Sequence, residues 1–404
     1  MTTITKSPMT APATNGVAAG AGAPAEEKPF SPRDFSMVFA LVAIWGFFAI
    51  VTPKFVSARN LSNLAVELSI TAVLALGMLL IILTGNIDLS IGSGVGLLGG
   101  VAAVLVFEHG WSAPPAMLVA LVAAVGIWVV MGKIIVSQRI PAFIITLAGL
   151  MVFKGLHWLV IHNATIPVST GGQDNLYSLL TTWYLPPLWS GVLGAATFAA
   201  MVWMQQRERS RRAALGFPNQ AGDLAFARLL VTGQIILIFV LVCNQFRGIP
   251  LSAIILAVTA LVVWTISQHT RLGRYFYAVG GNEEAAHISG VPVGKVIVYA
   301  FAIMGAITAL GGFLQTAYAG ASTTTTGELL ELDAIAACVI GGASLKGGRG
   351  TVAGVLFGSL IMASLMNGMT LMAVSPEIKY IARGLVLALA VWLDARLGST
   401  RGRA

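Results

Sequence analysis

The stretch Leu83–Gly100 reads LTGNIDLSIGSGVGLLGG and interrupts a chain dominated by apolar runs. It places Asn86, Asp88 and two serines between two apolar segments and contains six glycines. Irregular, glycine-rich backbone at membrane depth is tolerated only where it is buried in protein or lines a water-filled cavity. The stretch therefore indicates a broken helix inside a membrane protein, and it raises the question of what the carboxylate does there.

The composition places the chain in a membrane. Of its 404 residues, 57% are hydrophobic and 10% are charged, and the mean hydropathy is +0.85. A soluble domain is usually about 25% charged, and a bilayer core needs roughly 20 apolar residues per helix. We therefore expect an all-α polytopic membrane protein with about 10–12 transmembrane helices, some of them broken or half-length. One transmembrane domain is expected over 35–394, with spans near Phe35–Val51, Val66–Leu83, Leu89–Phe107, Pro115–Met131, Phe143–Val160, Leu188–Met204, Leu229–Cys243, Ser252–Ile266, Val296–Tyr318, Leu332–Gly342, Val352–Thr370 and Ile378–Leu393.

Basic residues set the expected orientation. Residues 1–34, rich in Ala, Pro, Thr and Gly, are expected to form a disordered cytoplasmic tail. Most of the 24 Lys and Arg then fall in cytoplasmic segments, as the positive-inside rule requires. The rule also explains the net charge of +8 without a nucleic-acid partner. Both termini, including the basic tail 395–404, are expected in the cytoplasm.

The sequence lacks the motifs of the common catalytic sites. It has no GxxxxGK[ST] phosphate loop, and its one GxGxxG match, Gly94 to Gly99, lies inside a predicted span with no strand before it. The two cysteines, Cys243 and Cys338, lie in apolar runs and give no CxxC or Cys/His spacing. We expect no enzymatic activity, no cofactor and no metal in this chain. Energy for transport would come from a partner or from an ion gradient.

Two compatible functions are open for the break around Asp88. Its carboxylate suits the start of the following helix as a cap, and it also suits the wall of a substrate path. GNIDLSIGSG and GGASLKGGRG share Gly, Leu, Gly and Gly at equal offsets, which favours two pseudo-repeated halves, as in transporters. The residues expected along a translocation path are Asn86, Asp88, Ser90, Gly92, Ser93, Asp333, Gly341 and Gly342.

Two cytoplasmic loops stand out. The loop over 205–228 joins an extra helix pair at about 188–245 and contains RERSRR, which indicates a topology anchor facing anionic lipid or a partner-docking segment. The loop over 268–295 contains GGNEEAAHISG, in which Asn282 predicts a helix cap and Gly290 a helix stop. This small helix is either ordinary loop structure or a peg for a cytoplasmic partner. The residues of the predicted peg are Gly281, Asn282, Glu283, Glu284, Ala285, Ala286 and Gly290.

At these motifs the chain resembles a known family, the permease subunits of bacterial ABC importers for monosaccharides, in the ribose/xylose/galactose branch. The resemblance reaches from about Leu61 to Leu393. The extra helix pair around RERSRRAALG is similar to that of the xylose members. The stretches that carry the resemblance are ALGMLLIILTGNIDLSIGS, RIPAFIITLAGL, TRLGRYFYAVGGNEEAAHISGVPV and ELDAIAACVIGGASLKGGRGTVAG.

The resemblance implies a multi-pass protein of the bacterial inner membrane that forms a homodimer. It implies a cytoplasmic ABC ATPase partner, coupled through the GGNEEAAHISG segment, a periplasmic sugar-binding protein and a monosaccharide substrate, D-xylose first. An ion-coupled secondary sugar carrier, with Asp88 or Asp333 as the ion site, is the alternative.

Overall fold

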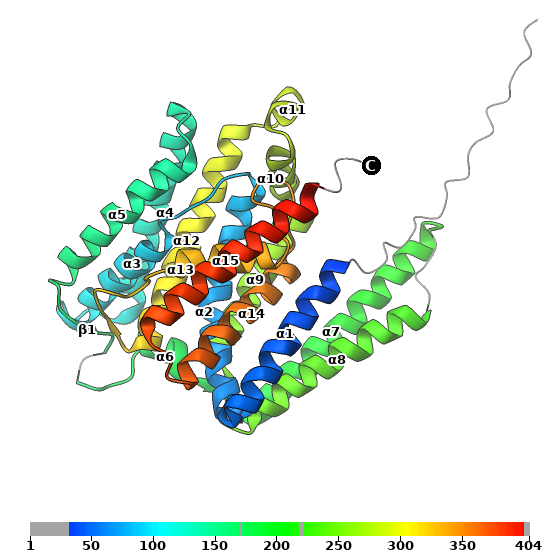
Figure 1. Cartoon of the computed structure of the whole chain (residues 1–404), viewed down its shortest axis with the longest axis horizontal. Helices are drawn as coiled ribbons and strands as arrows, with labels where there is room; N and C mark the ends of the chain where they lie inside the picture. The colour runs from blue at the N-terminus through cyan, green and yellow to red at the C-terminus, as the bar shows by residue number, and fades with distance from the viewer. Residues whose placement is uncertain (1–31, 170, 218–221, 400–404) are drawn as a thin grey trace, which may run out of the picture.

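The structure, a computed structural model, describes residues 32–169, 171–217 and 222–399. These residues form a bundle of α-helices (Figure 1), because in lipid every backbone polar group must be satisfied within the chain and a helix does this locally. The helices are α1 (Pro32–Val51), α2 (Ala58–Leu83), α3 (Ile91–Phe107), α4 (Ala113–Gln138), α5 (Ala142–Val160), α6 (Leu176–Thr182), α7 (Pro187–Ala214), α8 (Gly222–Asn244), α9 (Leu251–His269), α10 (Arg271–Gly281), α11 (Glu283–Ile288), α12 (Val293–Ala319), α13 (Leu330–Ile340), α14 (Val352–Leu371) and α15 (Pro376–Ser399), with a 3-10 turn η1 (Pro53–Val56).

Within the described ranges, eight helices are long and apolar enough to cross a membrane. Each predicted span coincides with a helix, although α2 begins at Ala58, well before the predicted start. The expected all-α polytopic fold is therefore confirmed. The predicted tail 1–34 lies outside the described residues up to residue 31, and α1 begins at Pro32. In the predicted tail 395–404, α15 continues to Ser399 and residues 400–404 lie outside the described residues.

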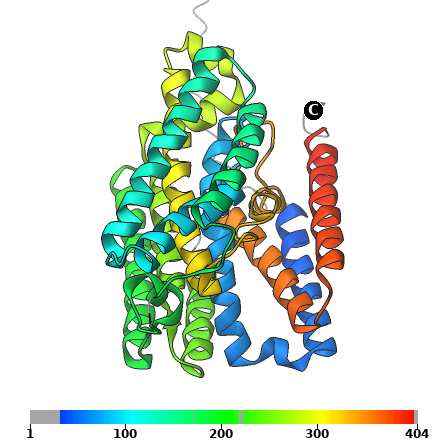
Figure 2. The same cartoon turned by 90° about the vertical axis from the view of Figure 1, so that its left-hand side faces the viewer.

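The core is built around α2. In its most apolar stretch 83% of the residues are buried, compared with 11% in α7. Helices α3, α4, α9, α12, α13 and α14 pack near α2 or one another. Helices α7 and α8 pack against each other at one edge of the bundle (Figure 1), in the region where the sequence predicted an extra helix pair. Helix α15, red in Figure 2, stands at the margin of the bundle.

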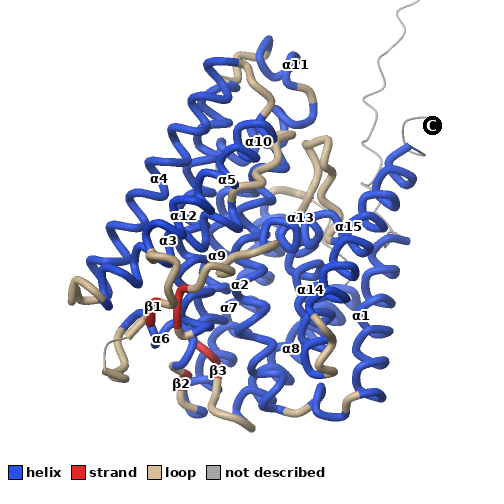
Figure 3. The backbone as a smooth tube through the Cα atoms, turned by 60° about the vertical axis from the view of Figure 1, so that its left-hand side comes forward, coloured by secondary structure: helices blue, strands red, loops and turns tan. Residues whose placement is uncertain are grey.

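The two ends of the bundle differ. Helices α10 and α11 project at one end, here called the α11 end, and α6 and the strands lie at the other, the α6 end (Figure 3). There β1 (Ile166–Pro167) pairs antiparallel with β4 (Ala321–Ser322), and β2 (Tyr184–Leu185) with β3 (Ile249–Pro250). Helix α1 begins and α15 ends at the α11 end (Figure 1). The two ends of the described chain therefore share one side of the bundle.

Candidate translocation site

Asp88 sits in the break between α2 and α3 and is fully buried. Its Oδ1 accepts hydrogen bonds from the backbone N–H of Ser90 at 2.8 Å and from the Ser90 hydroxyl at 2.6 Å. Its Oδ2 accepts a hydrogen bond of 2.6 Å from the indole N–H of Trp128 on α4. The carboxylate therefore closes the turn that leads into α3 and fastens that turn to α4. It is not the helix cap itself, because Ser90 is the N-cap residue of α3 and the first N–H groups of the helix bond to no side chain there.

The other predicted path residues of this break are mostly used locally. The side-chain amide of Asn86 donates to the Thr84 hydroxyl at 3.0 Å. The Ser90 hydroxyl donates its hydrogen bond to Asp88. A Cβ on Gly92 would lie 2.6 Å from the Gly327 carbonyl oxygen, so Gly92 permits close backbone contact. Ser93, by contrast, is half-buried and faces a cavity.

This cavity has a volume of about 160 Å³ and lies between α3, α5 and the non-helical segment that leads into α13. Hydroxyl and charged groups make up much of its wall. Its lining residues are Ser93, Leu150, Lys154, His157, Thr324, Thr326, Gly327, Glu328, Leu329 and Glu331. Ser93 is the one predicted path residue among them.

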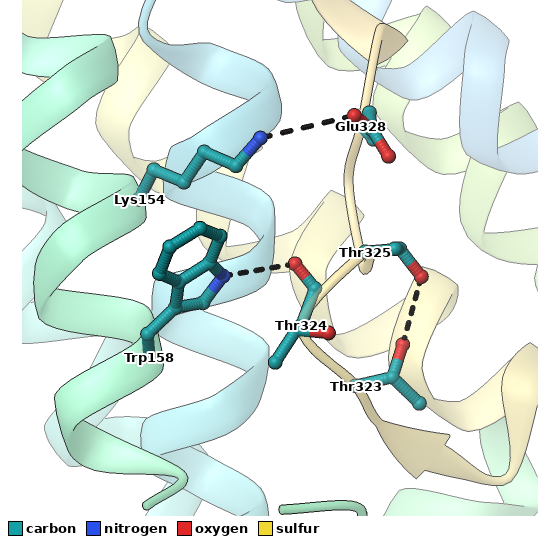
Figure 4. Close-up of polar contacts among 6 residues, drawn as sticks. All are labelled: Lys154, Trp158, Thr323, Thr324, Thr325 and Glu328. Atoms are coloured by element: carbon teal, nitrogen blue, oxygen red, sulfur yellow. Dashed lines mark hydrogen bonds and ion pairs between the residues drawn. The ribbon is translucent and has the colours of Figure 1, made fainter. Parts of the chain in front are cut away.

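The segment 323–329 is held against α5 by polar contacts (Figure 4). The Lys154 ammonium lies 3.7 Å from Glu328 Oε1, and the Trp158 indole N–H donates to the Thr324 carbonyl oxygen at 3.0 Å. One turn away, His157 Nε2 lies 3.0 Å from the Ser322 hydroxyl. Residues on two successive turns of α5 thus bind the irregular segment. The cavity lies between this segment, α5 and α3.

Helix α13 is a half-length helix. Its 11 residues extend roughly 16 Å at 1.5 Å per residue, about half of the roughly 30 Å hydrocarbon core. Asp333 lies on another face of α13, where its Oδ1 is 3.0 Å from Arg383 Nε on α15. Asp333 is therefore an ion-pair partner of α15 and is absent from the cavity lining.

The two glycine-rich breaks meet at the α11 end. The Gly348 N–H, in the break after α13, donates to the Leu83 carbonyl oxygen at the end of α2, at 3.1 Å. Gly280 of α10 packs on the same two residues so closely that a Cβ there would overlap the Leu83 carbonyl oxygen. Gly341 is packed in the same manner against the backbone of Gly354 on α14. We call the contact of Leu83, Gly280 and Gly348 the glycine junction.

Gly342 and Tyr277 complete the surroundings of the glycine junction. Gly342 has a φ of +92°, which only glycine adopts without strain, and it turns the chain out of α13. The Tyr277 hydroxyl of α10 donates to the Gly350 carbonyl oxygen at 2.8 Å and accepts from Gln268 Nε2 at 3.0 Å. Burial is the main cause that raises the pKa of Tyr277. Helix α10 is thus fixed to the break after α13.

Helix α11 is capped at both ends. The Asn282 side chain accepts a hydrogen bond of 2.9 Å from the Ala285 N–H. At the other end, the N–H groups of Gly290 and Val291 donate to the carbonyl oxygens of His287 and Ala286, and Gly290 has a φ of +82°. This is the Schellman pattern that ends a helix at glycine. The predicted cap and stop are both confirmed.

The surface of α11 is almost entirely open. Of the predicted peg residues only Ala286 is buried, while Gly281, Asn282, Glu283, Glu284, Ala285 and Gly290 are exposed. Ile288, a large apolar side chain, is 79% exposed. A well-capped six-residue helix that exposes both acidic residues and an isoleucine is a candidate contact for another protein.

Sequence reasoning missed the charged lining of the cavity. Lys154 and His157 lie within the predicted span Phe143–Val160, and Glu328 and Glu331 are not among the predicted path residues. The available signal was a polar run, TTTTGELLE at 323–331, between two apolar segments. Ionisable residues inside membrane spans are rare and usually functional, so this run is as strong a signal as the break at Asp88.

Broken helices, a polar cavity between them and an exposed capped helix at one end define a polytopic membrane protein of the transport class. The family model described as "Branched-chain amino acid transport system / permease component" matches residues 60–391. The chain belongs to this family of permease components.

The curated relatives share most of their length with the chain. The xylose transport system permease protein XylH of Escherichia coli (strain K12) is 40% identical over 369 residues, 91% of this chain and 93% of that protein. The protein of the same name from Haemophilus influenzae is 38% identical over 364 residues, 89% and 95% of the two chains. The ribose import permease protein RbsC of Escherichia coli (strain K12) is 32% identical over 358 residues, 88% and 92%. These matches confirm the resemblance to monosaccharide permeases. No solved structure matches the chain.

Proposed function

We propose that the chain is the membrane-spanning subunit of an ATP-binding-cassette importer that moves D-xylose into the bacterial cytoplasm. Similarity supports the substrate, because identity is 40% to a xylose permease and 32% to a ribose permease over comparable lengths. The polar cavity supports a hydrophilic solute. The chain has no phosphate-binding loop of its own, so ATP hydrolysis is assigned to a separate subunit.

The exposure of α11 is the observation that carries the ATPase assignment. The α11 end is taken to face the cytoplasm, where α11 inserts into a groove on the ATPase. Glu283 and Glu284 supply charge and Ile288 supplies an apolar anchor of 79% exposure. Both termini then lie in the cytoplasm, and the basic residues of α7 that follow its apolar part face the inner leaflet, as the positive-inside rule requires.

The α6 end then faces the periplasm and receives sugar from a soluble binding protein. In this proposal two copies of the chain form a homodimer in the inner membrane with two ATPase subunits. Specificity for the sugar lies mostly in the binding protein. The permease needs only a low-affinity path, which agrees with the small volume of the cavity.

The glycine junction suggests how ATP binding reaches the membrane. Force applied to α11 passes through α10 to Gly280, which touches the end of α2 and the break after α13 through backbone atoms. Contacts between backbone atoms cannot be absorbed by a side-chain rotation. A displacement of α10 therefore moves both breaks, and with α13 it moves one wall of the cavity.

The first experiment measures labelled D-xylose uptake by cells with and without the gene, with ion gradients collapsed by ionophore while ATP is maintained. Uptake that depends on the gene and survives the collapse supports the proposed importer. Uptake that disappears with the gradients would favour the ion-coupled carrier. The absence of gene-dependent uptake would exclude xylose and direct the assay to other monosaccharides.

A second experiment tests the ATPase contact. Deletion of residues 283–286 is expected to abolish uptake and co-purification of the ATPase while membrane insertion is retained. A gentler variant, Glu283→Ala with Glu284→Ala, should weaken co-purification. Glu377→Ala is the matched control, because Glu377 is also exposed and α15 begins at the end of the bundle opposite α11. Normal co-purification of the double variant together with normal uptake of the deletion would exclude α11 as the contact.

A further inference from the structure

Glu331 is a buried carboxylate without a side-chain partner. It is 7% exposed, and among the described residues no side chain forms a hydrogen bond or ion pair with it. The charges of Lys154, Glu328 and Asp333 act on it electrostatically. It lines the cavity, and its Oε2 touches Gly92 of α3. Glu331 therefore points into the space between α3 and α13.

A buried carboxylate to which no side chain donates a hydrogen bond is destabilising, because burial removes part of its hydration and leaves only the water that the cavity admits. Ionisable residues buried in membrane proteins usually mark the pathway of a substrate or an ion. The nearby carboxylates are already occupied: Asp88 accepts three hydrogen bonds, and Asp333 pairs with Arg383. Glu331 alone among these has acceptor capacity to offer to a ligand.

The cavity has an inner wall and an open side. His157 is 2% exposed and, with Glu331, forms the inner wall. The side chains of Lys154 and Glu328 are 41% and 36% exposed and form the open side, as Figure 4 shows for their facing charges. Ser93 and two threonines add hydroxyl groups that both donate and accept. A ligand here meets donors and acceptors on several sides at once.

The size of the cavity suits one six-membered ring. Its volume is about 160 Å³, and an engineered protein cavity of about 150 Å³ holds a benzene molecule. A pentose in its pyranose form has a ring of that size, with hydroxyl groups that can donate to Glu331. A disaccharide is too large.

We propose that this cavity is a transit site for the monosaccharide, where Glu331 accepts hydrogen bonds from ring hydroxyls and the Lys154–Glu328 pair lines the entrance. This inference rests on the proposed function and assigns its path to the segment 323–331. The lining carries one Lys and two Glu, so a sugar phosphate is repelled. A branched-chain amino acid, whose aliphatic side chain cannot satisfy buried polar groups, is also a poor fit.

The test replaces Ser93 by Cys in the full transporter and measures its reaction with a small hydrophilic thiol reagent in membranes stripped of binding protein. Wild-type protein is the background, because Cys243 and Cys338 are both buried. Ser112→Cys in an exposed loop is the positive control, and Ser359→Cys, buried on α14 away from the cavity, is the negative control.

Labelling of Ser93→Cys is expected to slow as D-xylose is added, by about tenfold when the sugar is near ten times its dissociation constant. Sucrose and leucine should not slow it. Combined with Glu331→Gln, protection should require about tenfold more xylose or higher, because a charged acceptor is lost. Glu67→Gln, whose carboxylate binds Tyr318 and Asn367 outside the cavity, is the matched control and should leave protection unchanged.

Several outcomes would overturn the proposal. These are no labelling at Ser93→Cys when Ser112→Cys reacts, labelling that xylose does not slow, or protection by leucine instead. Equal protection in the Glu331→Gln and Glu67→Gln variants would remove Glu331 from the site. If Glu331→Gln does not fold, the measurement on Ser93→Cys alone still decides. Normal ATP-driven xylose uptake without protection would refute this site and leave the proposed importer intact.

Discussion

The substitution Gly280→Ala tests the packing of the glycine junction, and Gly281→Ala is its control. The two positions differ in the space available for a Cβ atom. A Cβ on Gly280 would overlap the Leu83 carbonyl oxygen and lie 2.5 Å from the Gly348 nitrogen, whereas a Cβ on Gly281 would have no atom within 4 Å. Both glycines end the same helix with ordinary helical backbone. The gain of up to about 1 kcal/mol from replacing a helical glycine by alanine therefore applies to both variants.

The stability difference between Gly280→Ala and Gly281→Ala is the steric cost alone, which is about 1–3 kcal/mol for an added methyl group in a packed interior. We expect the upper part of this range, since the obstructing atoms belong to backbone and cannot rotate away. The assay follows thermal loss of the monodisperse peak in detergent. Gly280→Ala should melt lower than wild type, and Gly281→Ala at or slightly above it. Equal melting temperatures for the two variants would refute the close packing.

Three further changes have distinct expected results. Asp88→Ala should lower folded yield and thermal stability, because Trp128 loses its acceptor and an unsatisfied buried donor costs about 1–3 kcal/mol; unchanged melting would contradict this. Asn282→Ala removes a helix cap worth about 1 kcal/mol, so ATPase co-purification should fall while the bundle melts normally, and a lower melting temperature would show that α11 supports the bundle. Arg383→Ala should destabilise the protein by about 3–5 kcal/mol, because Asp333 is left as an unpaired buried charge. Adding Asp333→Asn should restore part of the lost stability, and no recovery would argue against the ion pair.

The helices were predictable because apolar runs of membrane length leave the backbone few alternatives. The segment 332–342 was predictably too short to span the membrane alone, since few apolar residues lie between the threonines and the glycines, and α13 has 11 residues. The cap and stop of α11 were also predictable, because Asn282 and Gly290 act through bonds to residues within four positions. Local chemistry of this kind is present in the sequence itself.

The cavity was not predictable in the same way. Lys154 and Glu328 are far apart in the sequence, and their contact exists only because α5 packs beside the non-helical segment before α13. Asp88 stands near glycines in the sequence, yet those glycines permit close packing, and its carboxylate accepts a hydrogen bond from Trp128. The sequence alone does not show whether a carboxylate already accepts hydrogen bonds from the protein or is available to a ligand.

The contrast among the buried carboxylates also separates the two transport mechanisms. An ion-coupled carrier needs a carboxylate that binds and releases a cation as the protein changes state. Asp88 is bound by three donors and Asp333 is neutralised by Arg383, so both are engaged with the protein. Glu331 has no such partner, but it lies among hydroxyl groups in a cavity of about 160 Å³, which is large for a bare ion and suits a ring. Under the proposed function, this arrangement favours a neutral polyol over a bare ion as the solute.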